Sequence, residues 1–278
     1  MLATPCRSSH SSGPLRRTPF YELHKESGAK FIDFFGWEMP VLYNGLGVKK
    51  EVEVCRKGAA IFDVSHMGQV RIHGPDREKF IEKMTVVDIK KAPYRSLKYT
   101  IIPNSRGGTI DDAVVSRLED HLHLVINSAC YDKDMKHFAA HLIEFPGLQL
   151  EPLYDTHALV AIQGPKAERT LAALMSPEDA ARIRNLKFMT RMNATLGGVS
   201  GVIVSRCGYT GEDGFEVCMP IRSANELVRK MTTIPDVAFA GLGARDSLRL
   251  EAALTLYGND LSEDITLSEA GLNWTVCK

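Results

Sequence analysis

Two strand-like runs on either side of a short turn constrain the fold more than any other stretch of the chain. Residues 112–118 and 121–127 flank this turn, and apolar residues recur at every second position of the later run. A period of two predicts a β-hairpin, whose two strands are antiparallel. His121 and His123 fall on the face opposite the apolar residues, where we expect them to be solvated.

Helix and strand signals alternate along the rest of the chain. Helices are predicted over 46–59, 74–84, 131–144, 224–232 and 244–255. Strands are predicted over 69–73, 158–163, 200–206 and 215–219. The helix at 224–232 rests on a capping box, Ser223-x-x-Glu226, and Ile143 is expected on the apolar stripe of the helix at 131–144. Hairpins mixed with helices, without strict β-α-β order, indicate an α+β fold of mostly antiparallel sheets in two interleaved subdomains.

The charge balance and the length of the apolar stretches argue against two broad functional classes. The 278 residues include 34 basic side chains (Lys and Arg) and 34 acidic ones (Asp and Glu). The formal net charge is therefore zero, so no overall field attracts nucleic acid. No stretch approaches the roughly 18–20 consecutive apolar residues that a membrane-spanning helix needs. We therefore expect neither a nucleic-acid partner nor a membrane segment.

The first residues have a composition of their own. They contain Arg7, Arg16 and Arg17, and the first acidic residue is Glu22. An Arg- and Ser-rich segment without acids is typical of an organellar leader, so we predict a mitochondrial transit peptide over residues 1–17. The alternative is a flexible terminus that carries no targeting signal.

The cysteines and the glycine-rich loops exclude several kinds of site. There is no Cys-x-x-Cys pair and no histidine at metal-ligand spacing, which predicts reduced thiols and no metal site. No phosphate-binding loop of the Gly-x-Gly-x-x-Gly or Gly-x-x-x-x-Gly-Lys type follows a strand. The six cysteines are Cys6, Cys55, Cys130, Cys207, Cys218 and Cys277.

Three stretches are richer in polar residues than the fold requires, and the first is Gly107-Gly108-Thr109-Ile110-Asp111-Asp112. Consecutive acids at the start of a strand face opposite sides, so one of them points into the domain. An inward carboxylate is costly unless a partner or a ligand meets it. The alternative is a pair of turn-forming aspartates.

The second stretch is Arg-Cys-Gly-Tyr-Thr-Gly-Glu-Asp-Gly-Phe-Glu over residues 206–216. Its glycines permit an unusual loop, and Glu216 alternates with Phe215 and Val217 on the strand that follows. Such a carboxylate is able to accept two parallel N–H bonds, for example from the amino edge of a pterin. The alternative is a hairpin whose acids only solvate the turn.

The third stretch runs from Gly241 to Glu251 and places Arg245 in the first turn of a helix. The helix dipole disfavours a cation there, which suggests a partner such as a ligand carboxylate. The alternative is an ion pair between Arg245 and either Asp246 or Glu251.

Taken together with four further segments, these stretches resemble the aminomethyltransferases, the T-proteins of the glycine cleavage system. The resemblance runs in order from about Thr18 to the end of the sequence. The seven matching pieces are Phe34-Phe35-Gly36-Trp37-Glu38-Met39-Pro40, Phe62-Asp63-Val64-Ser65-His66-Met67-Gly68, Gly107 to Asp112, Gln163-Gly164-Pro165, Arg206 to Glu216, Gly241 to Glu251, and Leu256-Tyr257-Gly258-Asn259-Asp260.

This resemblance implies a fold and a reaction. The family binds tetrahydrofolate at the centre of a three-domain ring, and a small β-barrel domain that we expect to be absent here completes the ring. The family transfers the methylene of an aminomethyl group, carried on the lipoyl arm of H-protein, to tetrahydrofolate. The products are 5,10-methylenetetrahydrofolate and ammonia. With the leader, the resemblance implies a place in the mitochondrial matrix.

The resemblance also assigns roles to residues. Asp112 corresponds to the essential aspartate, which we expect to orient the folate and to stabilise positive charge. Glu212 and Asp213 are expected to have no ligand role. The folate contacts that the resemblance implies are Tyr209, Glu216, Arg245, Met67, Tyr99, Val125 and Asn127.

Three alternatives stay open at the level of the sequence. The chain could be a non-catalytic folate-binding relative, of the kind that assists iron–sulfur assembly. Those proteins carry Lys-Gly-Cys-Tyr-x-Gly-Gln-Glu, whereas this sequence has Gly-Tyr-Thr-Gly-Glu-Asp-Gly. It could instead be an inactive truncated product, or a detached folate domain of a dimethylglycine- or sarcosine-dehydrogenase type protein.

Overall fold

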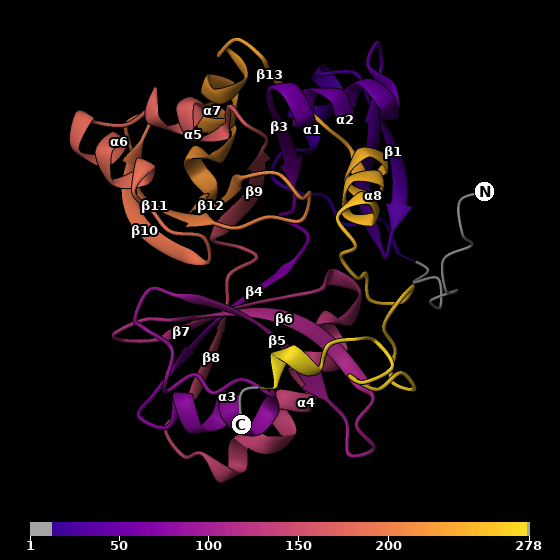
Figure 1. Ribbon diagram of the computed structural model, residues 1–278, viewed down its shortest axis with the longest axis vertical. Coiled ribbons are helices and arrows are strands. Elements are labelled where there is room, and N and C mark those ends of the chain that lie inside the picture. Colours follow the sequence, from indigo (N-terminus) through magenta and orange to yellow (C-terminus); the bar gives the residue numbers. More distant parts are fainter. Residues whose placement is uncertain (1–12, 277–278) are drawn as a thin grey trace. The chain divides into compact units, whose positions relative to one another are not determined.

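The computed structural model describes residues 13–276, which form two compact units (Figure 1). One unit consists of Met67–Leu153 and 255–276, and the other of 13–66 and Tyr154–Leu254. Each unit is built from two separate segments of the chain, and each combines helices with a largely antiparallel sheet. The prediction of an α+β fold with two interleaved subdomains is confirmed. Residues 1–12 of the predicted leader and two of the cysteines, Cys6 and Cys277, lie outside the described residues.

The first unit contains a five-stranded antiparallel sheet in the order β5-β6-β7-β4-β8. One face of this sheet packs against α3 and α4 around Phe80 and Phe138, which are fully buried. The predicted hairpin is β6-β7. The elements of this unit are β4 (Gly68–His73), α3 (Arg77–Met84), β5 (Leu97–Pro103), β6 (Thr109–Arg117), β7 (Leu122–Ile126), η1 (Ser128–Cys130), α4 (Tyr131–His141), η2 (Leu142–Glu144), β8 (Gln149–Pro152) and η3 (Asn273–Thr275).

Two expectations for this unit are wrong. His123 was expected to be solvated but is only 6% exposed. Both faces of β7 are covered, so the side chains on either face of the strand are buried. Ile143 is 87% exposed, because α4 ends at His141 and the following 3-10 turn rotates it away from the apolar stripe.

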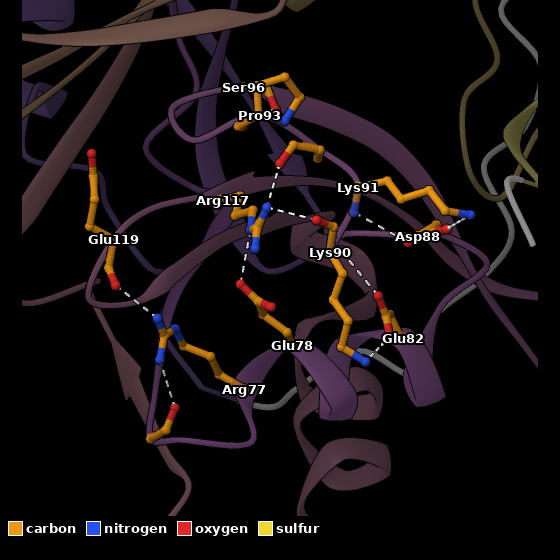
Figure 2. A network of polar contacts seen from close by, with 12 residues as sticks. Arg77, Glu78, Glu82, Asp88, Lys90, Lys91, Pro93, Ser96, Arg117 and Glu119 are labelled. Atoms are coloured by element: carbon orange, nitrogen blue, oxygen red, sulfur yellow. Dashed lines mark hydrogen bonds and ion pairs between the residues drawn. The ribbon is translucent and has the colours of Figure 1, made fainter.

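A network around Arg117 fixes α3 and the segment that follows it against the sheet (Figure 2). The Nε atom of Arg117 donates to Glu78 on α3 at 2.9 Å. Its Nη1 atom donates to the carbonyl oxygens of Lys90 and Ala92 at 2.8 and 2.7 Å. One guanidinium group on β6 therefore satisfies three acceptors that lie far from it in sequence.

The returning segment 255–276 packs on the other face of this sheet. Leu261, Leu267 and Leu272 form a small apolar cluster with Ile101 of β5. Gly108 makes the closest approach, since a Cβ atom there would lie 1.8 Å from the carbonyl oxygen of Glu263. The second glycine of the Gly107-Gly108 pair is thus required by packing.

The second unit contains a six-stranded sheet in the order β10-β11-β12-β9-β3-β13, antiparallel except for the β3-β13 pair, and a separate β1-β2 hairpin. A large apolar core lies on the face of the sheet that α5, α6 and α7 cover. Its elements are α1 (Tyr21–Glu26), β1 (Ala29–Phe34), β2 (Trp37–Tyr43), α2 (Gly47–Lys57), β3 (Ala59–Asp63), β9 (His157–Gln163), α5 (Ala167–Ala172), α6 (Pro177–Arg184), β10 (Thr190–Leu196), β11 (Val199–Arg206), β12 (Gly214–Pro220), α7 (Ile221–Thr232), β13 (Val237–Phe239) and α8 (Leu242–Glu251).

The predicted capping box is wrong. Helix α7 begins at Ile221, directly after β12, so Ser223 lies inside its first turn and caps nothing. Glu226 instead pairs with Lys230 at 2.7 Å, one turn further along the helix. Helix α8 also begins two residues earlier and ends four residues earlier than the predicted 244–255.

Residues 13–17, the described part of the predicted leader, contact the β1-β2 hairpin. The backbone N–H of Arg16 donates to Gly36 O, and Glu38 N–H donates to Arg16 O, each at 2.8 Å. The Arg16 guanidinium lies 4.0 Å from the ring centre of Trp37 and 4.7 Å from that of Tyr154. This part of the range is therefore held by the folded chain.

Within residues 13–276, no helix has the length and apolar character needed to cross a membrane. The four cysteines in this range, Cys55, Cys130, Cys207 and Cys218, are buried and form no disulfide bond. No group of three or more His, Cys, Asp or Glu side chains in this range is arranged to hold a metal ion.

Candidate functional site

The first unit gathers several of the predicted site residues on one face of its sheet. Asp112 pairs with Ile101, and Val114 pairs with both Tyr99 and Val125. Because paired residues and every second residue share a face, Tyr99, Asp112 and Val125 lie on the side opposite α3 and α4.

Two further predicted residues lie at the ends of strands in the same unit. Asn127 follows the last residue of β7, two positions after Val125. Met67 is half-buried and immediately precedes β4, so the strand register does not fix its side.

The paired acids face opposite sides of β6, as the alternation predicts. Asp111 is fully buried and accepts bonds from Asn127, from the backbone N–H at 3.0 Å and from Nδ2 at 2.9 Å. Asp112 is half-buried, and its Oδ1 lies 2.9 Å from the same Nδ2. The amide of Asn127 thus links the two carboxyl groups.

The carboxyl group of Asp112 is tuned to titrate near neutrality. Burial and the negative charge of Asp111 raise the pKa of Asp112 to about 7, against hydrogen bonds from Tyr99 and Asn127. A carboxyl group with such a pKa is able both to hold a negative charge and to exchange a proton at physiological pH.

An aromatic residue that the sequence did not single out stacks on Tyr99. The Trp274 ring stacks on Tyr99 with ring centres 5.7 Å apart and an interplanar angle of 21°. The pair comes from distant parts of the sequence, and no local pattern indicated it.

In the second unit, Glu216 projects from the centre of the six-stranded sheet. It pairs with Ser205 on β11 and with Ala161 on β9. Its neighbours Phe215 and Val217 point into the apolar core, so Glu216 lies on the opposite face. Burial raises the pKa of Glu216, and the positive charge of Arg245 acts against this shift.

The loop before Glu216 rests on a buried glutamine. Thr210 Oγ1 donates to Gln163 Oε1, and Gln163 Nε2 donates to Cys207 O, each at 3.0 Å. A Cβ atom at Gly208 would lie only 1.9 Å from Gln163 Oε1, so the glycine is needed for this close approach. Residue types alone gave no role to Gln163, although its Gln-Gly-Pro segment was part of the family resemblance.

Glu212 and Asp213, the conspicuous acids of this loop, form ion pairs within the unit. Arg56 Nη1 lies 2.8 Å from Glu212 Oε1, and Arg206 Nη2 lies 2.6 Å from Asp213 Oδ2. These contacts hold the loop in place and account for both acids without a ligand.

Arg245 differs from these arginines. The alternative of an ion pair with Asp246 or Glu251 is wrong, because both acids pair with other arginines. Its guanidinium carbon instead lies 4.7 Å from the ring centre of Tyr209. Its Nη1 atom is buried and has no hydrogen-bond partner among residues 13–276.

The start of α8, which carries Arg245, is fixed by a buried carboxylate. Glu51 is fully buried and accepts the backbone N–H groups of Tyr43 at 2.7 Å and Gly241 at 2.9 Å. A Cβ atom at Gly241 would lie 2.4 Å from the backbone carbonyl group of Val41. Close packing against Val41 therefore requires glycine at position 241.

Comparisons with known proteins agree on one group. The sequence model of one protein family, the GCVT N-terminal domain, matches residues 20–278. A mitochondrial aminomethyltransferase of Dictyostelium discoideum is 45% identical, covering 96% of this chain and 68% of the relative. The human mitochondrial aminomethyltransferase is 40% identical, covering 95% and 65% respectively. The crystal structure of glycine cleavage system aminomethyltransferase T from Bartonella henselae has a TM-score of 0.86 at 37% identity, covering 95% of this chain and 70% of that one. The chain thus spans about two thirds of the length of these proteins.

Proposed function

Since the chain belongs to the GCVT N-terminal domain family, to which the aminomethyltransferases belong, we propose that it takes part in the T-protein reaction of glycine cleavage. In this reaction the methylene of an aminomethyl group on the lipoyl arm of H-protein passes to tetrahydrofolate. The products are 5,10-methylenetetrahydrofolate and ammonia. The acid-free composition of residues 1–17 and the mitochondrial names of the relatives support a place in the mitochondrial matrix.

The observation that carries the proposal is the polar cluster of the second unit. The Nη1 atom of Arg245 is a buried donor that finds no acceptor in the described part of the chain, and Glu216 is an acceptor held on a strand beside the Tyr209 loop. A buried donor without a partner costs about 1–3 kcal/mol, so a ligand that supplies an acceptor is favoured there. The pterin of tetrahydrofolate fits this set, because it has acceptors for Arg245, an amino edge for Glu216 and a flat ring for Tyr209.

Asp112 supplies the charged group that the chemistry needs. Tetrahydrofolate, when bound, supplies the nucleophilic nitrogens. We assign to Asp112 the tasks of holding a negative charge near the carbon that becomes positive and of exchanging protons as ammonia leaves. Its pKa near 7 suits both tasks, and Tyr99 and Asn127 orient it. Val125 and Met67 are assigned as apolar contacts of the folate.

Two measurements on the same preparation test the proposal. Isothermal titration with tetrahydrofolate measures binding, and an ammonia-release assay with aminomethyl-loaded H-protein measures turnover. Saturable binding together with ammonia release that depends on tetrahydrofolate is expected. Binding without ammonia release would favour a non-catalytic folate-binding relative, and the absence of binding would overturn the proposal.

A further inference from the structure

A third carboxyl group lies behind the Asp111-Asp112 pair. Asp134 comes from α4 and is fully buried. Neither of its carboxyl oxygens receives a hydrogen bond from an N–H or hydroxyl group among residues 13–276. The group that it meets is the carboxyl group of Asp111, which is buried on the face of β6 that α4 covers.

This contact requires a proton. Two ionised carboxylates have only acceptor oxygens, so they repel each other and are unable to form a hydrogen bond. Burying both charges side by side would also cost far more than burying one. We propose that Asp134 and Asp111 share one proton, that Asp134 carries it, and that the pair thereby positions Asn127 and Asp112.

The hydrogen-bond partners decide which of the two carboxyl groups carries the proton. Asp111 accepts two hydrogen bonds from N–H groups of Asn127, and the thiol of Cys130 is a third donor to it. All three interactions favour the ionised form of Asp111. Asp134 receives no bond from such a donor within residues 13–276, so its neutral form is favoured. The O–H of Asp134 therefore donates to a carboxylate oxygen of Asp111.

The other charged groups near Asp111 and Asp134 do not favour ionisation of both carboxyl groups. The nearby cation, Lys133, is engaged elsewhere, since its Nζ donates to Tyr257 at 2.6 Å and to Glu263 at 3.1 Å. Asp112 adds a further negative charge on the β6 side. The three carboxyl groups thus face little positive charge, which favours keeping a proton among them.

The shared proton connects to the site through Asn127. Asp111, kept ionised by Asp134, holds the backbone N–H and Nδ2 of Asn127, and the same Nδ2 lies 2.9 Å from Asp112 Oδ1. Asp134 is therefore a positioning residue that acts on Asp112 through Asp111 and Asn127. Its effect on activity rests on the proposed function, whereas the shared proton does not.

Infrared spectroscopy of the full chain tests the proton itself. At mildly alkaline pH the wild-type protein should show the carbonyl stretch of a buried, protonated carboxyl group. Asp134→Asn should remove this band, because the amide still donates to Asp111 but brings no carboxylic acid. Asp132→Asn is the matched control, since Asp132 is exposed on the same helix, and it should leave the band unchanged. A wild-type spectrum without the band, or a band that survives in Asp134→Asn, would overturn the proposal.

The pH dependence of ammonia release tests the positioning role. Asp134→Asn should keep the wild-type midpoint, because its amide replaces the O–H donor. Asp134→Leu offers no donor, so Asp111 should take up the proton itself, and its lost charge should move the midpoint about one pH unit lower. An Asp134→Leu midpoint equal to that of Asp134→Asn would overturn the positioning role. If no variant and no wild type released ammonia, the proposed function would fail, while the infrared result would still decide the shared proton.

Discussion

The guanidinium group of Arg245 lies over the ring of Tyr209, 4.7 Å from its centre, instead of pairing with a carboxylate of its own helix. A cation over an aromatic face is held in position while most of its hydrogen-bond donors stay available. The buried Nη1 atom, which has no partner among the described residues, is one such donor. This relationship favours a ligand acceptor at Arg245 and leads to the first prediction.

Arg245→Lys should weaken the binding of tetrahydrofolate by about 10-fold or more, because lysine keeps the charge but loses the planar donor that a single charged hydrogen bond requires. Isothermal titration calorimetry measures the change. Arg229→Lys is the matched control, since Arg229 is exposed on α7 and pairs with Glu26, and it should bind as the wild type does. Equal affinities for the two variants would contradict a ligand role for Arg245.

Asp112→Asn should leave tetrahydrofolate binding largely intact and reduce turnover by about 100-fold or more, because the amide removes the charge that stabilises a developing cation. The ammonia-release assay with loaded H-protein measures turnover, and calorimetry measures binding on the same sample. A near wild-type rate would show that Asp112 has a different role. A loss of binding equal to the loss of rate would assign Asp112 to folate binding instead.

The value of kcat/KM should rise with pH and level off above a midpoint of about 7, because burial and the charge of Asp111 raise the pKa of Asp112 to that value. Below the midpoint the carboxyl group is protonated, and the rate should fall about tenfold for each pH unit. The pH profile of ammonia release at low tetrahydrofolate concentration measures it. A profile that stays flat through neutrality would contradict the assignment of Asp112 as the ionised group.

The parts of the fold that the sequence predicted are local. The β6-β7 hairpin follows from a period of two, and the same alternation placed Asp111 and Asp112 on opposite faces of one strand. The register of neighbouring strands then brought Tyr99, Asp112 and Val125 to one face. These results depend on backbone geometry that each strand carries by itself.

The missed features depend on contacts between distant segments. Gln163 supports the Tyr209 loop from another strand, and Asp134 meets Asp111 across 23 positions of sequence, counted from 111 to 134. The periodicity of apolar residues predicts single helices and strands, but it does not predict which helix will cover which strand. The false capping box at Ser223 has a similar cause, because β12 runs directly into α7 and the helix needs no side-chain cap there.

Removal of residues 13–17 should destabilise the second unit. A chain that begins at Thr18 loses the Arg16 stack on Trp37 and Tyr154 and two backbone hydrogen bonds to the hairpin. The expected loss is about 1 to 2 kcal/mol of unfolding free energy relative to a chain that begins at Gly13. Urea denaturation of the two chains measures the difference. Equal midpoints would mean that the Arg16 contacts add no stability, and cleavage of a leader after residue 17 would then be tolerated.

Asp134→Asn should stabilise the protein increasingly as the pH rises. Burial and the neighbouring Asp111 charge raise the pKa of Asp134 to about 10 in the folded chain, whereas an unfolded aspartate ionises near pH 4. Between these values unfolding releases a proton, so the wild-type free energy of unfolding falls by up to ~1.4 kcal/mol for each pH unit. Asparagine has no proton to release and removes this contribution.

Thermal unfolding of the wild type and of Asp134→Asn measures this effect. The Tm difference in favour of the variant should be larger at about pH 9 than at about pH 5, because the wild-type penalty accumulates over that interval. Asp132→Asn, on the exposed side of α4, should show no such trend. A Tm difference that is constant with pH would mean that Asp134 is ionised in the folded protein, which would contradict the shared proton as well.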